Sequence, residues 1–145
     1  NSHFHMRILE EAYPSLPFCV YLVVKSHPNH TIKADDYPGL TLEFTEKSLD
    51  IILNDFDVVY TGSVTSAVVE ANYFNLHIIS SLNPNLLNMS PLRGEIGITF
   101  VSSAKALRLS LKEIIKNNIR KRTVTKNFFY LDKSLKRWKK LLLSV

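Results

Sequence analysis

The chain has 145 residues, of which 46% are hydrophobic and 21% charged, and its formal net charge is +5. This composition is that of one globular domain with a sizeable core, and it excludes a disordered chain. Its uninterrupted apolar runs are far shorter than the roughly 20 residues that a membrane span needs. We therefore expect a soluble, cytoplasmic protein. Its single cysteine, Cys19, can form no internal disulfide.

The positive charge belongs to one part of the chain. Residues 119–145 hold nine Lys or Arg against Asp132 alone, a net charge of +8. Residues 1–118 hold nine basic and twelve acidic residues, a net charge of −3. The partner of the basic tail is therefore a separate question from the function of the core.

Strand and helix patterns alternate along the first 118 residues. Helical spacing of apolar residues predicts helices over 1–12, 47–56, 64–75 and 103–118. β-branched and aromatic runs predict buried strands over 18–25, 40–45, 57–61, 76–80 and 97–101. Strands that alternate with helices pair in parallel through right-handed crossovers. We expect an α/β fold: a Rossmann-like open parallel sheet of about five strands over 1–118, then a basic linker and amphipathic helix over 119–145.

A histidine-proline segment, KSHPNH, follows the first predicted strand. Ligands of open α/β sheets bind beyond the carboxyl ends of the strands, where this segment lies. Pro28 restricts the backbone of His27, whose imidazole can donate to a phosphate oxygen or transfer a proton. The alternative is a plain surface turn. A metal site is not expected, because His27 and His30 have no third ligand at a suitable spacing.

A hydroxyl-rich turn joins the third predicted strand to its helix. It consists of glycine and three hydroxyl residues: Gly62, Ser63, Thr65 and Ser66. The first turn of a helix has unpaired N–H groups, so we interpret these residues as a phosphate-binding turn. Glu70 lies one helical turn beyond Ser66 and is placed to accept both hydroxyls of a ribose. Alternatively, Ser63 or Thr65 is only a helix cap and Glu70 a solvated or capping residue.

Three segments together resemble a known class of enzymes. VVKSHPN, FDVVYTGSVTSAVVEANYFNLHII and FFYLDKSLKRWKKLL, in this order, resemble the nucleotide-sugar-binding, C-terminal half of GT-B glycosyltransferases of bacterial capsule and lipopolysaccharide synthesis. These enzymes include sialyltransferases and polysialyltransferases with His-Pro and Ser-rich motifs. The resemblance covers the chain from about residue 5 to the end.

The resemblance implies roles for particular residues. His27 would contact the donor phosphate and stabilise the departing nucleotide, and Glu70 would bind the ribose. The donor phosphate would be held by Lys25 and the hydroxyl turn: Gly62, Ser63, Thr65 and Ser66. The base would be read by the loop after the second strand: Thr45, Glu46 and Lys47.

The same resemblance implies the ligands and partners. The substrate would be a nucleotide sugar, CMP- or UDP-linked, with no further cofactor and no metal, and the acceptor would be a glycan or a lipid-linked glycan. The general base of such enzymes lies on an N-terminal GT-B domain that is missing from this chain. We therefore expect the chain to bind nucleotide without turnover. Two alternatives stay open: a nucleotide-sugar 2-epimerase domain, and a non-catalytic binding or scaffold module.

Two interpretations of the basic tail remain open. Leu131, Leu135, Trp138 and Leu142 share a helical face, with lysines on the others. This face can pack on the domain or on the absent N-terminal half. It can instead lie on an anionic membrane surface, which would make the protein peripheral at the inner membrane. Nucleic acid is not expected, because no basic and aromatic residues interleave as such binding requires.

Overall fold

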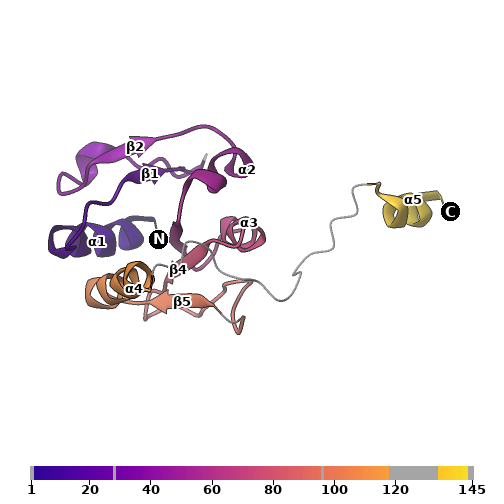
Figure 1. Cartoon of the computed structure of the whole chain (residues 1–145). Helices are drawn as coiled ribbons and strands as arrows, with labels where there is room; N and C mark the ends of the chain where they lie inside the picture. The colour runs from indigo at the N-terminus through magenta and orange to yellow at the C-terminus, as the bar shows by residue number, and fades with distance from the viewer. Residues whose placement is uncertain (1, 28, 96, 118–133, 144–145) are drawn as a thin grey trace.

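The computed structural model describes residues 2–27, 29–95, 97–117 and 134–143 (Figure 1). The strands are β1 (Leu22–Val24), β2 (Leu42–Phe44), β3 (Val58–Gly62), β4 (His77–Ser81) and β5 (Ile98–Val101). The α-helices are α1 (Ser2–Ala12), α2 (Leu49–Ile52), α3 (Ala67–Tyr73), α4 (Ala104–Lys116) and α5 (Lys136–Leu143). Short 3-10 helices are η1 (Tyr13–Ser15), η2 (Ala34–Asp36) and η3 (Leu53–Asp55). The predicted α/β alternation is confirmed.

The strands pair in parallel, but they form two sheets. β1 pairs with β2, with Leu22 opposite Leu42, and the second sheet has the order β3-β4-β5, with Val58 opposite His77 and Ile78 opposite Ile98. The single five-stranded sheet predicted from the sequence is therefore not what the described residues form. β1 and β2 are each three residues long, and all three residues of β1 pair with β2.

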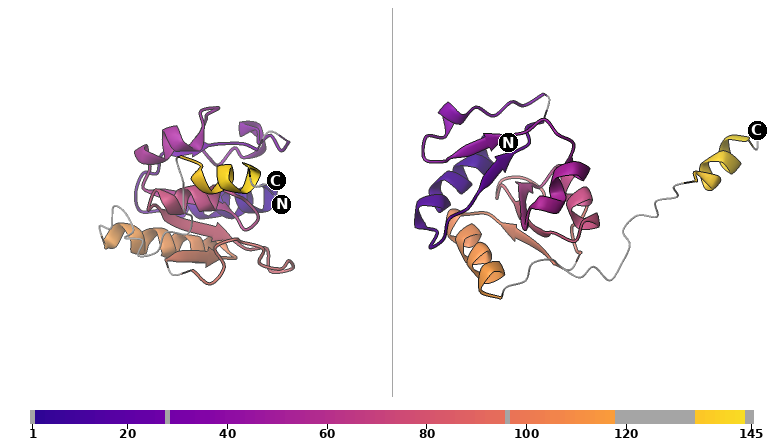
Figure 2. Two further views of the ribbon diagram at one scale, coloured as in Figure 1. Left: turned by 90° about the vertical axis from the view of Figure 1, so that its right-hand side faces the viewer. Right: turned by 45° about the horizontal axis from the view of Figure 1, so that its top comes forward.

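The three-stranded sheet has helices on both faces. On one face Val68 and Ala71 of α3 pack with Ile78 of β4, and Leu92 completes this small cluster. On the other face the larger cluster joins Ile79 of β4 to α1 and α4. Figure 2 shows the resulting layers, with α1 between the β1–β2 pair and α4. Successive residues of β4, Ile78 and Ile79, therefore enter different cores, as the twofold period of a strand requires.

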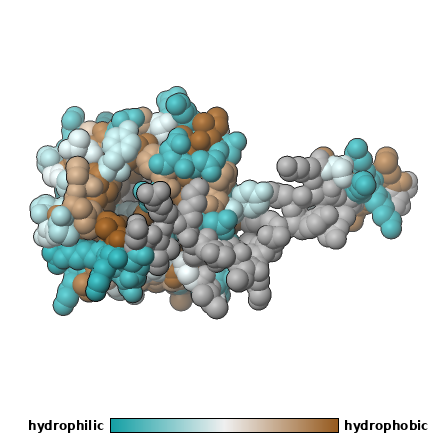
Figure 3. Space-filling view, in the orientation of Figure 1, coloured by the Kyte–Doolittle hydropathy of each residue, from teal (hydrophilic) through white to brown (hydrophobic). Residues whose placement is uncertain are grey.

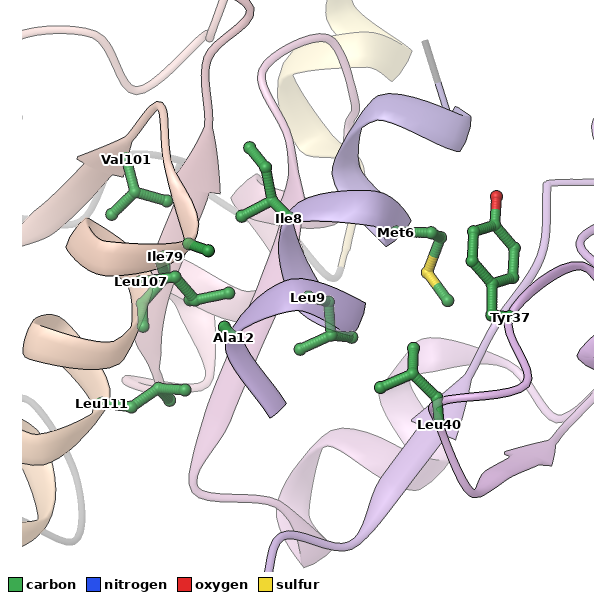
Figure 4. Close-up of a cluster of buried hydrophobic side chains, with 11 residues drawn as sticks. Met6, Ile8, Leu9, Ala12, Tyr37, Leu40, Ile79, Val101, Leu107 and Leu111 are labelled. Atoms are coloured by element: carbon green, nitrogen blue, oxygen red, sulfur yellow. The ribbon is translucent and has the colours of Figure 1, made fainter. Parts of the chain in front are cut away.

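Helix α1 links the two sheets through its apolar stripe (Figure 4). On one side Met6 and Leu9 lie near Tyr37 and Leu40, beside the β1–β2 pair. On the other side Ile8 faces the residues of β4, β5 and α4. Ala12 is completely buried, so a small residue stands where the helices come close.

Two helix ends are defined by specific hydrogen bonds. The side chain of Ser103, at the N-cap of α4, accepts from the Ala106 N–H, a bond that serine commonly makes at this position. α3 ends in a Schellman motif, in which the Leu76 N–H donates to the Ala71 carbonyl and the Asn75 N–H to the Asn72 carbonyl. Asn75 has φ 60° there, a left-handed conformation that asparagine tolerates better than most residues.

Several elements are shorter than the sequence patterns predict. The predicted helix 47–56 is one α-helical turn, α2, that continues as η3, and short polar side chains at Asn54 and Asp55 compete with helical bonding there. The predicted helix 64–75 begins only at Ala67, because Thr65 Oγ1 accepts the Ala67 N–H at 3.2 Å and forms a local turn.

The C-terminal helix α5 stands apart from the other elements in Figure 1. Trp138 and Leu142 are 62% and 68% exposed. Residues 119–133 of the predicted basic linker, with Leu131 of the predicted apolar face, lie outside the described residues. No helix among the described residues is long and apolar enough to cross a membrane.

Candidate functional site

The hydroxyl turn lies at the carboxyl end of β3, as predicted. Gly62 is the last residue of β3, and Ser66 is the residue from which α3 begins. Ser66 makes no capping bond with its side chain and is exposed, while Thr65 Oγ1 is occupied by the Ala67 N–H. Ser63 is half-buried, and Glu70 is exposed within the first turn of α3. The side chain of Ser66 is therefore available to a ligand, and the carboxylate of Glu70 is open to solvent.

Gly62 is in close contact with a histidine that the sequence analysis did not single out. A Cβ added to Gly62 would lie only 2.9 Å from Cδ2 of His5 and closer still to Nε2. The imidazole of His5, on α1, therefore covers the side of Gly62 where a side chain would begin. The absence of a Cβ at Gly62 therefore accommodates the His5 ring of this helix.

His5 is held by a short chain of hydrogen bonds at the ends of β3 and β4. Its Nδ1 is bonded to Ser81 Oγ, and Ser81 Oγ donates to the Thr61 carbonyl at 3.2 Å. The Ser81 hydroxyl has one hydrogen, so when it donates to Thr61 the imidazole donates from Nδ1 to Ser81 Oγ, and neutral His5 then carries its proton on Nδ1. The Tyr60 hydroxyl also donates to the His5 carbonyl at 2.9 Å, which ties α1 to β3.

Burial shifts the pKa values of two groups in this network. Removal from water disfavours the charged form of each group, so burial is the main cause that lowers the pKa of His5 below its ordinary value. Burial also raises the pKa of Tyr60 to about 12. Both groups are therefore neutral near pH 7, and the network carries no net charge of its own.

The lowered pKa of His5 predicts that acid destabilises the fold. In the unfolded chain the imidazole binds a proton as pH falls through its ordinary pKa of about 6.5, whereas in the folded chain it resists protonation to a lower pH. The free energy of unfolding should therefore decrease as pH falls below about 6.5. Urea titrations at successive pH values measure this slope. His5→Asn, which preserves a donor near the Nδ1 position, should show a shallower dependence, and an unchanged slope would contradict the assignment.

His27 lies in a turn closed by its own neighbours. The Asn29 N–H donates to His27 Nδ1 at 3.1 Å, and the His30 N–H donates to the His27 carbonyl at 2.9 Å. Because Nδ1 accepts, neutral His27 carries its proton on Nε2 and can donate from that atom. The side chain is exposed. The geometry therefore gives His27 one free donor at the end of β1, as a phosphate contact requires.

Lys25 and the predicted base-reading loop are adjacent. Lys25 Nζ donates to the Glu46 carbonyl at 2.8 Å, and the Lys47 N–H donates to Thr45 Oγ1 at 3.2 Å. Beside this loop is an open hollow of about 240 Å³ on the face of the β1–β2 sheet. Its lining residues are Tyr21, Val23, Glu43, Thr45, Lys47, Ile52, Asp55 and Phe56. The rings of Tyr21 and Phe56 are nearly parallel, with centroids 6.4 Å apart.

The structure thus brings the predicted site residues together in two groups. One group is Lys25 with the loop Thr45–Lys47, and the other is the turn after β3 with Glu70. His27 is near the first group in sequence, and among the described residues no hydrogen bond joins it to the turn after β3. The network around His5 was missed, although its signal was present: His5 shares a helical face with Ile8, Leu9 and Ala12, where an apolar residue is expected.

Comparison of the chain with known proteins finds no similar protein. No family model, curated protein or solved structure matches the chain. Among the described residues, no group of three or more His, Cys, Asp or Glu side chains is arranged to hold a metal ion.

Proposed function

We propose that residues 1–118 bind the nucleotide-sugar donor of an inverting, metal-independent glycosyltransferase of the GT-B type, in bacterial surface-carbohydrate synthesis. The observation that carries the proposal is the turn from Gly62 to Ser66, which follows a parallel strand and opens a helix. This is the position at which α/β folds bind phosphates. The resemblance in sequence supplies the substrate class.

Each group would have a distinct role in this function. The Ser66 hydroxyl and the first turn of α3 would hold the phosphates, and Glu70 would accept the ribose hydroxyls. His27 would donate from Nε2 to the phosphate oxygen on which negative charge develops as the glycosidic bond breaks. Donors fixed before the reaction stabilise that charge more effectively than water, which must reorient.

The loop from Thr45 to Lys47 is the proposed base-reading segment. Two of its residues line the hollow with Tyr21 and Phe56, and aromatic rings provide apolar surface for a planar base. Lys25, bonded to the Glu46 carbonyl, would hold the loop in place and add positive charge near the phosphates. The hollow supports this assignment because pockets that take small ligands combine apolar walls with a few polar groups.

The proposal is tested by titration calorimetry with CMP, UDP, GDP, ADP and dTDP. One base should bind more tightly than the others. Glu70→Gln and His27→Ala should each weaken that binding about tenfold or more, because a hydrogen bond to a charged group contributes about 1.5–3 kcal/mol. Glu113→Gln on α4 and His30→Ala are matched controls at exposed positions and should leave the affinity unchanged. Absence of binding by every nucleotide, or equal binding by Glu70→Gln, would contradict the proposal.

A further inference from the structure

Helix α5 carries two features that together require explanation. Its large apolar side chains are exposed: Trp138 by 62% and Leu142 by 68%. Lys136, Lys139 and Lys140 are exposed on the same eight-residue helix, and residues 134–143 contain no acidic residue. Single exposed apolar residues are ordinary on protein surfaces, but a tryptophan and several leucines gathered on one short helix mark an interaction surface.

The positions of these residues separate the two kinds of side chain. At 100° per residue, Trp138, Leu141 and Leu142 occupy one face, since they are spaced by three and four residues. Lys136 and Lys140 lie on the opposite face, and Lys139 flanks the apolar one. Leu143, at the last position, is the exception. Figure 3 shows both hydrophilic and hydrophobic side chains on this helix.

We propose that α5 is a membrane-surface anchor that lies on anionic lipid. One partner must accept both the apolar face and the positive charge, and an anionic bilayer does so within a few ångströms of depth. Tryptophan favours the boundary between headgroups and hydrocarbon, and lysine stems extend toward the headgroups. This inference is independent of the nucleotide site, because no residue of that site belongs to α5.

The size of the helix determines how the anchor behaves. Eight residues extend about 12 Å, so few side chains reach the bilayer and the binding is reversible. Electrostatic attraction supplies a large share of the binding free energy. This attraction weakens when salt shortens the Debye length from about 10 Å at 0.1 M to about 3 Å at 1 M. Binding should therefore require anionic lipid and decrease with salt.

The test uses the fluorescence of Trp138, the only tryptophan in the chain. The full chain is titrated with vesicles of phosphatidylcholine alone and with vesicles that also contain phosphatidylserine. The expected result is a blue shift of the emission with phosphatidylserine that reverses at high salt, with cosedimentation of the protein. No shift at low salt would overturn the proposal. A spectral response to nucleic acid but not to vesicles would also overturn it.

Matched variants distinguish membrane binding by α5 from general effects of changing the charge or apolar surface of the protein. Leu142→Glu should reduce partitioning about tenfold, and Lys140→Glu by a similar factor. The controls lie on α4, where Leu109 is 58% exposed and Lys112 is also exposed. Leu109→Glu and Lys112→Glu should each leave partitioning within about twofold of the original chain. If Leu142→Glu binds as well as Leu109→Glu, α5 is not the anchor.

Discussion

Replacement of Leu107 with alanine is expected to lower the free energy of unfolding by about 2–5 kcal/mol. Leu107 is completely buried between α4 and the sheet, in the cluster that also contains Ile79 and Val101. Truncation removes apolar contacts and leaves a cavity that elements on three sides keep from collapsing. Urea denaturation monitored by circular dichroism measures the change.

The same helix offers the control for this prediction. Leu109 is 58% exposed, two residues along α4, so Leu109→Ala has the same effect on helix propensity without opening a cavity. Leu109→Ala should change the free energy of unfolding by less than about 0.5 kcal/mol. If Leu107→Ala lowers the free energy of unfolding by less than about 1 kcal/mol, the core around α4 is less tightly packed than the burial of Leu107 indicates.

Gly62→Ala is the second substitution that we expect to lower the free energy of unfolding strongly. The new methyl group would meet the His5 imidazole, whose Cδ2 is 2.9 Å from the Cβ position. His5 cannot move away without losing its bond to Ser81, so the strain should cost about 1–3 kcal/mol. Thermal and urea unfolding of the single variant measure this cost.

A double-mutant cycle identifies the cause of that loss. His5→Ala removes the imidazole, so Gly62→Ala should cost much less in that background than in the original chain, with a coupling of about 0.5–3 kcal/mol. Additive effects would mean that the glycine is needed for some other reason, such as its backbone at the end of β3. Gly39→Ala is a useful comparison, because its nearest neighbour, Glu10 Cγ at 3.1 Å, belongs to a flexible side chain.

Much of the fold was predictable because its strands are apolar runs bounded by polar loops. The segments around β3 and β4 were predicted to within one residue, since Val59, Ile78 and Ile79 point into cores on opposite faces and leave no polar alternation. The division into two sheets was not predictable. Parallel pairing depends on contacts between segments distant in sequence, and residue patterns do not show which edges remain unpaired.

The candidate site was predictable only in part, for a related reason. Hydroxyl residues after a strand have a local signature, so the turn from Gly62 to Ser66 could be placed at the end of β3. The bond between His5 and Ser81 joins residues 76 positions apart, and no local pattern encodes it. A histidine on an apolar helical face only indicates that a partner must exist. Thus the sequence pattern indicates one role for Gly62, contact with a ligand, and the structure adds a second, contact with His5.

The position of α1 between the two sheets has a consequence for how the protein folds. Its apolar residues pack against α4, whose first residue, Ala104, follows Ala12 by 92 positions. During synthesis the stripe formed by Met6, Ile8 and Leu9 therefore has no complete binding surface until α4 has been made. Contacts of such long sequence separation slow folding and extend the time during which apolar surface is available to chaperones or to aggregation. The helix that joins the two halves of the core is thus made before the elements it packs against, and it is among the last to be fully buried.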